Sequence, residues 1–161
     1  MIVDVIVENL EVKLDLFEKL DAIVKEDAII ASNTSCLSVT AMAAKMKRPE
    51  RFVGLHFFNP PYAMRLVEVI EAIQTAPEIL QFGVAFCQRI GKTPVPVKDR
   101  PGFLVNRLLV PYLNHAAQAF DDALADRESL DQSINKGLGH PMGPLTLLDL
   151  VGIDVQTFVA D

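Results

Sequence analysis

The chain has 161 residues, of which 50% are hydrophobic and 22% are charged, and this balance indicates a globular protein with a real core rather than a disordered one. The formal net charge of −6 argues against a nucleic-acid partner, because binding to phosphates needs a basic surface. No apolar run approaches the roughly 18 residues of a membrane span, and the first ten residues lack the pattern of a secretion signal. We therefore expect a protein that is not secreted and has no membrane partner.

Cys36 and Cys87 stand in apolar sequence, which favours buried free thiols over a disulfide or a metal site.

The first part of the chain alternates predicted strands and helices. Apolar runs predict strands at residues 2–7, 28–31, 52–57, 66–70 and 93–97. Helical spacing of apolar residues predicts helices at residues 10–24, 39–46 and 77–90. Strands that alternate with helices pair in parallel through crossovers, so this part is expected to form an open α/β sheet. The third and fourth strands are joined around residues 59–62 by so short a connection that we expect antiparallel neighbours, with a looser loop as the alternative.

The remainder of the chain is predicted to be helical. Pro101 opens a long helix through about residue 124, with a kink expected at Pro111, and its first half is apolar on nearly every side, which indicates burial on several sides. Further helices are predicted at residues 126–137 and 144–152, and Asp154 is expected to cap a fourth. We therefore place the domain boundary between residues 98 and 99, and neither part is expected to be a complete domain.

His56 and Glu68 are the first candidates for chemistry. His56 ends an apolar run, where a lone histidine is more often a satisfied core residue than a catalytic one. Glu68 interrupts the run 66–70, and an ionised carboxylate there needs a partner. If the two strands are neighbours, the side chains can face each other, and a carboxylate beside an imidazole orients the ring and stabilises its charged form. The pair indicates either a general acid–base site or a structural salt bridge.

Two other features carry polar groups. Residues 32–35, the sequence Ser-Asn-Thr-Ser, follow the second predicted strand directly, and loops after strands form the ligand crevice of an open α/β sheet. These side chains either bind a ligand or cap the next helix, and both roles can hold at once. Asn106 lies in the most apolar turn of the long helix, so its amide is expected to find a partner in the backbone or in a ligand.

Six segments occur in a fixed order along the chain and are specific in combination. They are VEN at 7–9, ASNTS at 31–35, HFFNP at 56–60, LVEVI at 66–70, DRPGFLVNR at 99–107 and HPMGP at 140–144. Together they resemble the NAD-dependent L-3-hydroxyacyl-CoA dehydrogenases of fatty-acid β-oxidation and 3-hydroxybutyryl-CoA metabolism, from about Ile2 to the last residue. The resemblance implies the second part of a Rossmann-type, mostly parallel sheet domain that binds NAD, followed by an all-helical C-terminal domain. It also implies oxidation of L-3-hydroxyacyl-CoA to 3-ketoacyl-CoA in the bacterial cytoplasm or the mitochondrial matrix.

The resemblance assigns roles to individual positions. His56 would be the general base that takes the 3-hydroxyl proton, and Glu68 would hold the ring and balance its charge. Ser35 and Asn106 would act in catalysis by bonding the substrate's reacting oxygen or its thioester portion, and Asn59 would support the same pocket. The helical part would supply acyl-CoA contacts and the interface of a homodimer.

Four positions correspond to the cofactor side of the family. They are Glu8, Lys13, Asn33 and Ser35. Asp4, which also faces this side, stands where the family pattern has glutamate. The family's strand–G-x-G-x-x-G–helix segment and its last helices do not occur in the sequence, so we expect an internal fragment that is inactive alone, binds NADH weakly and self-associates through the open edge of strand 2–7.

Two rival functions remain open. One is a non-catalytic structural or interaction relative on the same fold, against which the presence of both His56 and Glu68 argues. The other is a dehydrogenase for 3-hydroxy acids that are not CoA thioesters, and Asn59 and Asn106 favour the thioester reading over it.

Overall fold

The computed structural model describes residues 1–152, and the contacts of the chain divide it into two compact units. The first unit is Met1–Leu104 and the second begins at Val105. No helix among the described residues is long and apolar enough to cross a membrane. The helix predicted to begin at Asp154 lies outside the described residues.

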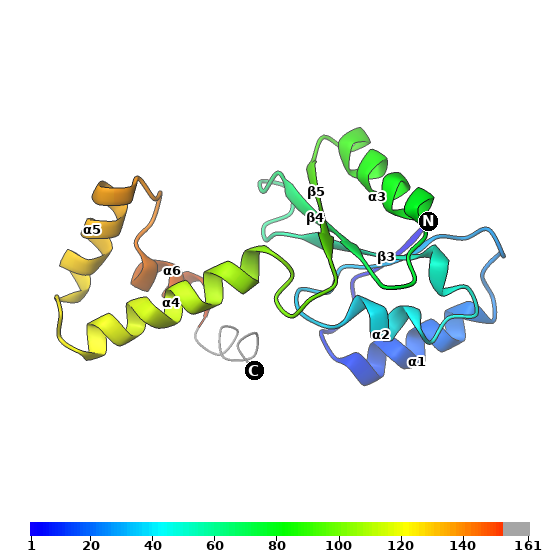
Figure 1. The fold of residues 1–161 in the computed structure, drawn as a ribbon, viewed down its shortest axis with the longest axis horizontal. Helices are drawn as coiled ribbons and strands as arrows, with labels where there is room; N and C mark the ends of the chain where they lie inside the picture. Colours follow the sequence, from blue (N-terminus) through cyan, green and yellow to red (C-terminus); the bar gives the residue numbers. More distant parts are fainter. Residues whose placement is uncertain (153–161) are drawn as a thin grey trace. The chain divides into compact units, whose positions relative to one another are not determined.

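A five-stranded sheet forms the centre of the first unit (Figure 1). Its strands are β1 (Ile2–Asp4), β2 (Ile30–Ser32), β3 (Phe52–Phe57), β4 (Leu66–Glu71) and β5 (Thr93–Lys98). They pair in chain order, all in parallel except β3 with β4, which are antiparallel. The mostly parallel α/β sheet and its one antiparallel pair are thus confirmed.

Helices cover both faces of this sheet. The helices α1 (Leu10–Asp21) and α2 (Val39–Ala43) pack on one face, and α3 (Pro77–Arg89) packs on the other (Figure 1). A single 3₁₀ turn, η1 (Pro49–Arg51), leads into β3. Covered faces explain why the central strands read as continuous apolar runs in the sequence.

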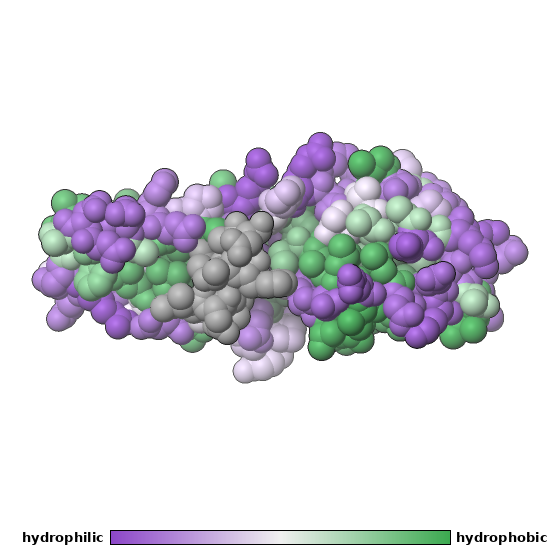
Figure 2. All heavy atoms as spheres, turned by 90° about the horizontal axis from the view of Figure 1, so that it is seen from below, coloured by the Kyte–Doolittle hydropathy of each residue, from purple (hydrophilic) through white to green (hydrophobic). Residues whose placement is uncertain are grey.

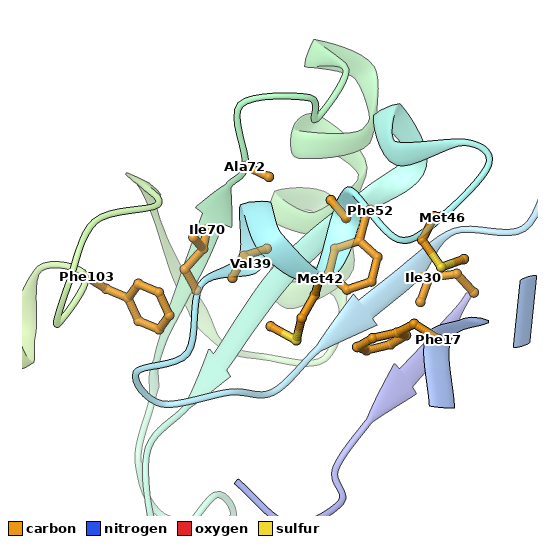
Figure 3. Close-up of a cluster of buried hydrophobic side chains, with 10 residues drawn as sticks. Phe17, Ile30, Val39, Met42, Met46, Phe52, Ile70, Ala72 and Phe103 are labelled. Atoms are coloured by element: carbon orange, nitrogen blue, oxygen red, sulfur yellow. The ribbon is translucent and has the colours of Figure 1, made fainter. Parts of the chain in front are cut away.

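Two cores follow from the alternation of side chains along the strands. The core under α1 and α2, drawn in Figure 3, includes Phe17, Ile30, Val39, Met42, Phe52, Ile70 and Phe103. The core under α3 includes Ile29, Ala31, Val53, Leu55, Val67, Val69, Ile79 and Cys87. His56 stands four residues after Phe52, and Glu68 stands two before Ile70. Both therefore belong to the α1–α2 face of the sheet.

The first strand is shorter than predicted, since the pairing of β1 with β2 ends at Asp4 although the apolar run continues to Val7. The Asp4 Oδ1 atom accepts a hydrogen bond from Ile6 N at 3.0 Å, a turn that diverts the backbone from the sheet. Val5 and Val7 are then largely exposed, at 73% and 64%. Figure 2, which views the molecule from below Figure 1, shows hydrophobic side chains at the surface among hydrophilic ones.

The second unit consists of three helices among the described residues. They are α4 (Val105–Asp121), α5 (Arg127–Leu138) and α6 (Pro144–Val151). The prediction that Pro101 starts the long helix was wrong: Gly102 and Phe103 have φ of 72° and 47°, outside the right-handed helical region, and α4 begins only afterwards. The expected burial of α4 on several sides is also wrong for this chain, since only Leu113 and Ala116 of the helix are buried.

Side chains and a glycine fix the ends of α5 and the start of α6. Asp126 caps α5 by accepting a hydrogen bond from Ser129 N at 2.9 Å, and Gly139, with φ of 71°, ends it. Asp131 of α5 accepts from the backbone of Leu145 at 2.8 Å and thereby ties the start of α6 to α5.

Candidate active site

His56 and Glu68 form a buried, hydrogen-bonded pair at the centre of the sheet. The register of β3 and β4 places the two residues directly opposite each other. His56 Nδ1 and Glu68 Oε2 are 2.8 Å apart, and the two residues are 4% and 1% exposed. Glu68 carries no hydrogen as a carboxylate, so Nδ1 supplies the hydrogen of this contact. In the neutral ring, Nε2 is then the basic nitrogen.

The surroundings of the pair hold both groups in place. Glu68 Oε1 accepts a second hydrogen bond from Leu104 N at 3.1 Å, so each carboxylate oxygen has a donor. The imidazole ring contacts Phe58 and Phe103, with ring centroids 4.4 and 5.7 Å away. A buried carboxylate without hydrogen bonds would be expensive, and here that cost is offset at both oxygens.

The polar loop after β2 lies beside the strand that carries His56. Asn33 Oδ1 accepts a hydrogen bond from Phe57 N at 2.9 Å, which connects the loop to the residue after His56. Parallel strands β1, β2 and β3 end at this edge, where ligands of open α/β sheets bind. Of the two alternatives for this loop, capping of the next helix does not apply, because α2 is capped by Ser38, which accepts from Ala41 N at 3.1 Å.

Glu8 is bonded to the same loop through one carboxylate oxygen. Its Oε1 accepts from Thr34 Oγ1 at 2.6 Å, from Ser35 N at 2.6 Å and from Cys36 N at 3.2 Å. Burial and the Glu8 carboxylate raise the pKa of the Cys36 thiol to about 11. Burial alone raises the pKa of the Cys87 thiol to about 11. Both cysteines are free thiols; Cys87 is buried as expected, and Cys36 is only half-buried.

Lys13 lies beneath Glu8 as a buried cation. Its Nζ is 2.7 Å from Asp4 Oδ2 and 3.7 Å from Glu8 Oε2, and its side chain is 1% exposed. Asp4 Oδ2 also accepts from Ser32 Oγ at 2.6 Å. The ends of β1 and β2 and the first turns of α1 are thus joined by one charged network.

Seven of the eight predicted site residues lie in the first unit. Glu8, Lys13, Asn33 and Ser35 gather around the loop after β2, and His56 with Glu68 lies one strand further. Asn59 is exposed in the turn after β3.

The remaining predicted polar residue, Asn106, lies near the start of α4 in the second unit. It is half-buried rather than buried, and it has an interaction partner.

One residue that supports the site was missed in the sequence: Leu104 donates its backbone N–H to Glu68, and its residue type gives no signal of this contact. Ser32, which belongs to the predicted polar segment 32–35, donates a hydrogen bond to Asp4. Asp4 did carry a signal, because it interrupts an otherwise apolar strand and therefore needed a partner.

A cavity of about 170 Å³ lies at the opposite ends of β2 and β3, away from this site. Ile30 and Phe52, the first residues of these strands, contribute to its lining. The two arginines of its lining form hydrogen bonds within the protein. Arg51 Nε donates to Ala28 O at 3.1 Å, and Arg48 donates to Glu26. This arrangement fits a structural role of the arginines.

Comparison with known proteins relates both parts of the chain to one family. Residues 1–100 match the family described as 3-hydroxyacyl-CoA dehydrogenase, NAD binding domain, and residues 102–161 match 3-hydroxyacyl-CoA dehydrogenase, C-terminal domain.

Relatives and solved structures agree with this match. The chain is 48% identical over 161 residues to mitochondrial hydroxyacyl-coenzyme A dehydrogenase from Homo sapiens, covering 100% of the chain and 51% of that protein. It is 44% identical over 155 residues to 3-hydroxybutyryl-CoA dehydrogenase from Clostridioides difficile, covering 96% and 55%. The crystal structure of (S)-3-hydroxybutyryl-CoA dehydrogenase from Ralstonia eutropha superposes with a TM-score of 0.96 at 42% identity, covering 98% of the chain and 56% of that structure. The chain spans about half the length of the curated relatives it matches.

Proposed function

The chain belongs to the 3-hydroxyacyl-CoA dehydrogenase family, and from that premise we propose that the protein containing it oxidises L-3-hydroxyacyl-CoA to 3-ketoacyl-CoA with NAD. The observation that carries this proposal is the buried contact between His56 and Glu68, 2.8 Å from nitrogen to oxygen. This contact supports general acid–base catalysis, because the carboxylate orients the imidazole and stabilises its protonated form.

His56 takes the proton of the substrate's 3-hydroxyl group. Glu68 holds Nδ1, so the basic Nε2 accepts the hydroxyl proton as the alcohol becomes a ketone, and the imidazolium that forms is stabilised by the adjacent carboxylate. In the reverse reaction His56 returns the proton to the carbonyl oxygen. When bound, NAD supplies the acceptor for the hydride that leaves C3.

Ser35, Asn106 and Asn59 are assigned to the substrate. The hydroxyl of Ser35 and the amide of Asn106 would bond the reacting oxygen or the thioester portion, and Asn59 would support the same pocket. Hydrogen-bond donors that meet a developing negative charge on oxygen favour the transition state. The helical second unit is assigned acyl-CoA contacts and the interface of a homodimer.

The residues on the cofactor side suit the nicotinamide end of NAD rather than its phosphates. Asn33 and Ser35 offer an amide and a hydroxyl, and both are half-buried beside the strand ends where nucleotides bind in such sheets. The cation of the set, Lys13, is 1% exposed and paired with Asp4. Neutral donors and acceptors fit a carboxamide and ribose hydroxyls better than phosphates. Asn33 and Ser35 would therefore contact the nicotinamide end, and Glu8 and Lys13 would hold this part of the cofactor side in place.

We also propose that the protein containing this chain acts in the bacterial cytoplasm or the mitochondrial matrix, because the chain is similar to a protein named as mitochondrial and to a bacterial dehydrogenase.

The direct test follows NADH oxidation by the protein that contains this chain, with acetoacetyl-CoA and with free acetoacetate as substrates. We expect turnover with the thioester and little with the free acid. Preference for the free acid would favour a dehydrogenase of non-CoA acids. No turnover with either substrate, in a folded protein that binds NADH, would favour a non-catalytic relative.

A further inference from the structure

Glu8 accepts three hydrogen bonds from the loop after β2 through one carboxylate oxygen. Its Oε1 receives the Thr34 hydroxyl at 2.6 Å and the backbone N–H groups of Ser35 and Cys36 at 2.6 and 3.2 Å. Thr34 Oγ1 in turn accepts from Leu37 N at 2.9 Å, so the bonded loop continues to the approach of α2. We infer that Glu8 is a positioning residue, which fixes Ser35 by clamping residues 34–36 through Oε1.

The clamp is anchored to a buried ion pair, Lys13 with Asp4. Lys13 Nζ lies 3.7 Å from the other Glu8 oxygen and 2.7 Å from Asp4, with both of these side chains at 1% exposure or less. Asp4 is fixed at the end of β1 and also accepts from Ser32 Oγ at the end of β2. The position of Glu8 is therefore set by β1, β2 and α1.

The loop is held at two points with different roles. Asn33 Oδ1 accepts from Phe57 N, next to His56, and Glu8 holds the three residues that follow. Charge-assisted hydrogen bonds such as those to Glu8 are about twice as strong as neutral ones. Removal of Glu8 therefore releases Ser35 while the Asn33 contact and the His56–Glu68 pair remain. The inference rests on the proposed function only where it assigns Ser35 to the substrate.

The kinetic test compares Glu8→Ala, Glu8→Gln, Ser35→Ala and Glu8→Ala/Ser35→Ala in the protein that contains this chain. We expect Glu8→Ala to lower kcat about 10- to 100-fold, since displacement of a site residue by 1 Å can cost about 100-fold. Glu8→Gln keeps an oxygen that accepts the N–H bonds and should recover most of kcat. The double variant should be no slower than Ser35→Ala, because both changes remove one function. An increase in KM for NADH with additive losses would instead make Glu8 a direct cofactor contact and overturn the inference.

A second readout does not depend on activity. Cys36 Sγ lies 3.7 Å from Glu8 Oε1, and the carboxylate helps raise the pKa of this thiol to about 11. In Glu8→Ala and Glu8→Gln the Cys36 pKa should fall, so iodoacetamide should alkylate Cys36 faster at pH 9. Cys87 serves as the internal control, because burial alone raises its pKa. Glu18→Gln, a change of an exposed glutamate on α1, is the control for loss of charge.

The two readouts separate the inference from the proposed function. If Ser35→Ala keeps full activity, the substrate role of Ser35 is wrong, but faster alkylation of Cys36 in both Glu8 variants still supports the clamp. An unchanged Cys36 rate in folded Glu8→Ala and Glu8→Gln proteins overturns it, whatever the kinetics.

Discussion

His56 and Glu68 are register partners across the antiparallel pair β3–β4, with Nδ1 and Oε2 2.8 Å apart. Each side chain therefore projects from a central strand rather than from a loop, and backbone pairing on both sides restricts its movement. Phe58 and Phe103 contact the ring, and Leu104 N donates to the carboxylate. Groups on rigid elements with bonded neighbours keep a catalytic geometry better than groups on loops.

The His56→Gln substitution should lower kcat with acetoacetyl-CoA by about 10² to 10⁴, the usual contribution of a positioned acid–base group. The reason is that glutamine can occupy the space but cannot exchange a proton. Steady-state kinetics of the protein that contains this chain is the measurement, with His115→Gln on the exposed side of α4 as the matched control. Retention of more than half of the parent kcat would remove His56 from the mechanism.

The Glu68→Gln substitution should also slow the reaction, by about 10² to 10⁴ as in other carboxylate–imidazole pairs that lose the charged partner. Glu68 accepts hydrogen bonds at both oxygens, from His56 and from Leu104 N. Glutamine has a single oxygen, so its amide N–H group must face one of these two donors, and facing His56 would favour the wrong tautomer. In a His56→Gln/Glu68→Gln double variant, the second substitution should lower kcat little further, because the two residues act as a unit. Additive losses of kcat would mean that the two residues act independently.

The strand pair that carries the site could be predicted from the sequence because both strands are short apolar runs on either side of a proline-rich turn. The pairing register could not be read in the same way. A shift of one residue would send Glu68 to the face of Val67 and Val69, under α3. The observed register is selected by the packing of the assembled sheet, because it places Phe52 and Ile70 in the core under α2.

The Glu8 clamp could not be predicted from residue types. Its partners lie 26 to 28 positions away, and two of the three donors are backbone N–H groups, which any residue provides. The end of β1 was mispredicted for a related reason: Val5 to Val7 look like strand, but the Asp4 carboxylate bonds the Ile6 backbone and ends the ladder. The start of α4 was mispredicted because Phe103 has a positive φ, which interrupts the helical backbone before Val105. Bulky residues rarely adopt a positive φ, so the residue type gave no indication of it.

The two thiols should make the protein less stable as the pH rises above 9. Both Cys36 and Cys87 have a pKa of about 11 in the folded chain, against an ordinary 9.0. Between these values the unfolded thiols have lost their protons while the folded ones keep them. The folded state binds more protons, so the free energy of unfolding falls with increasing pH.

The measurement is urea denaturation from pH 8 to 11 of the parent and of Cys36→Ala/Cys87→Ala. The double variant is expected to be less stable at pH 8, because Cys87 fills the α3 core, but its stability should decline less steeply with pH. Parallel curves for the two proteins would show that the thiols titrate normally.

Glycine at position 54 is required by the close packing of β3 against β4 and α2. A Cβ atom there would stand 2.7 Å from Ile70 Cβ and 2.9 Å from Val39 Cγ2. The first of these contacts involves an atom fixed to the backbone of β4, so the strands would have to separate. Gly54→Ala should therefore lower the free energy of unfolding by about 1–3 kcal/mol, the range of overpacked cores. Gly137→Ala in α5 is the matched control, because nothing lies within 4 Å of its Cβ and the helix should gain about 0.5–1 kcal/mol. Urea denaturation of both variants measures the difference, and equal stabilities would show that the sheet absorbs the added methyl group without separating β3 from its neighbours.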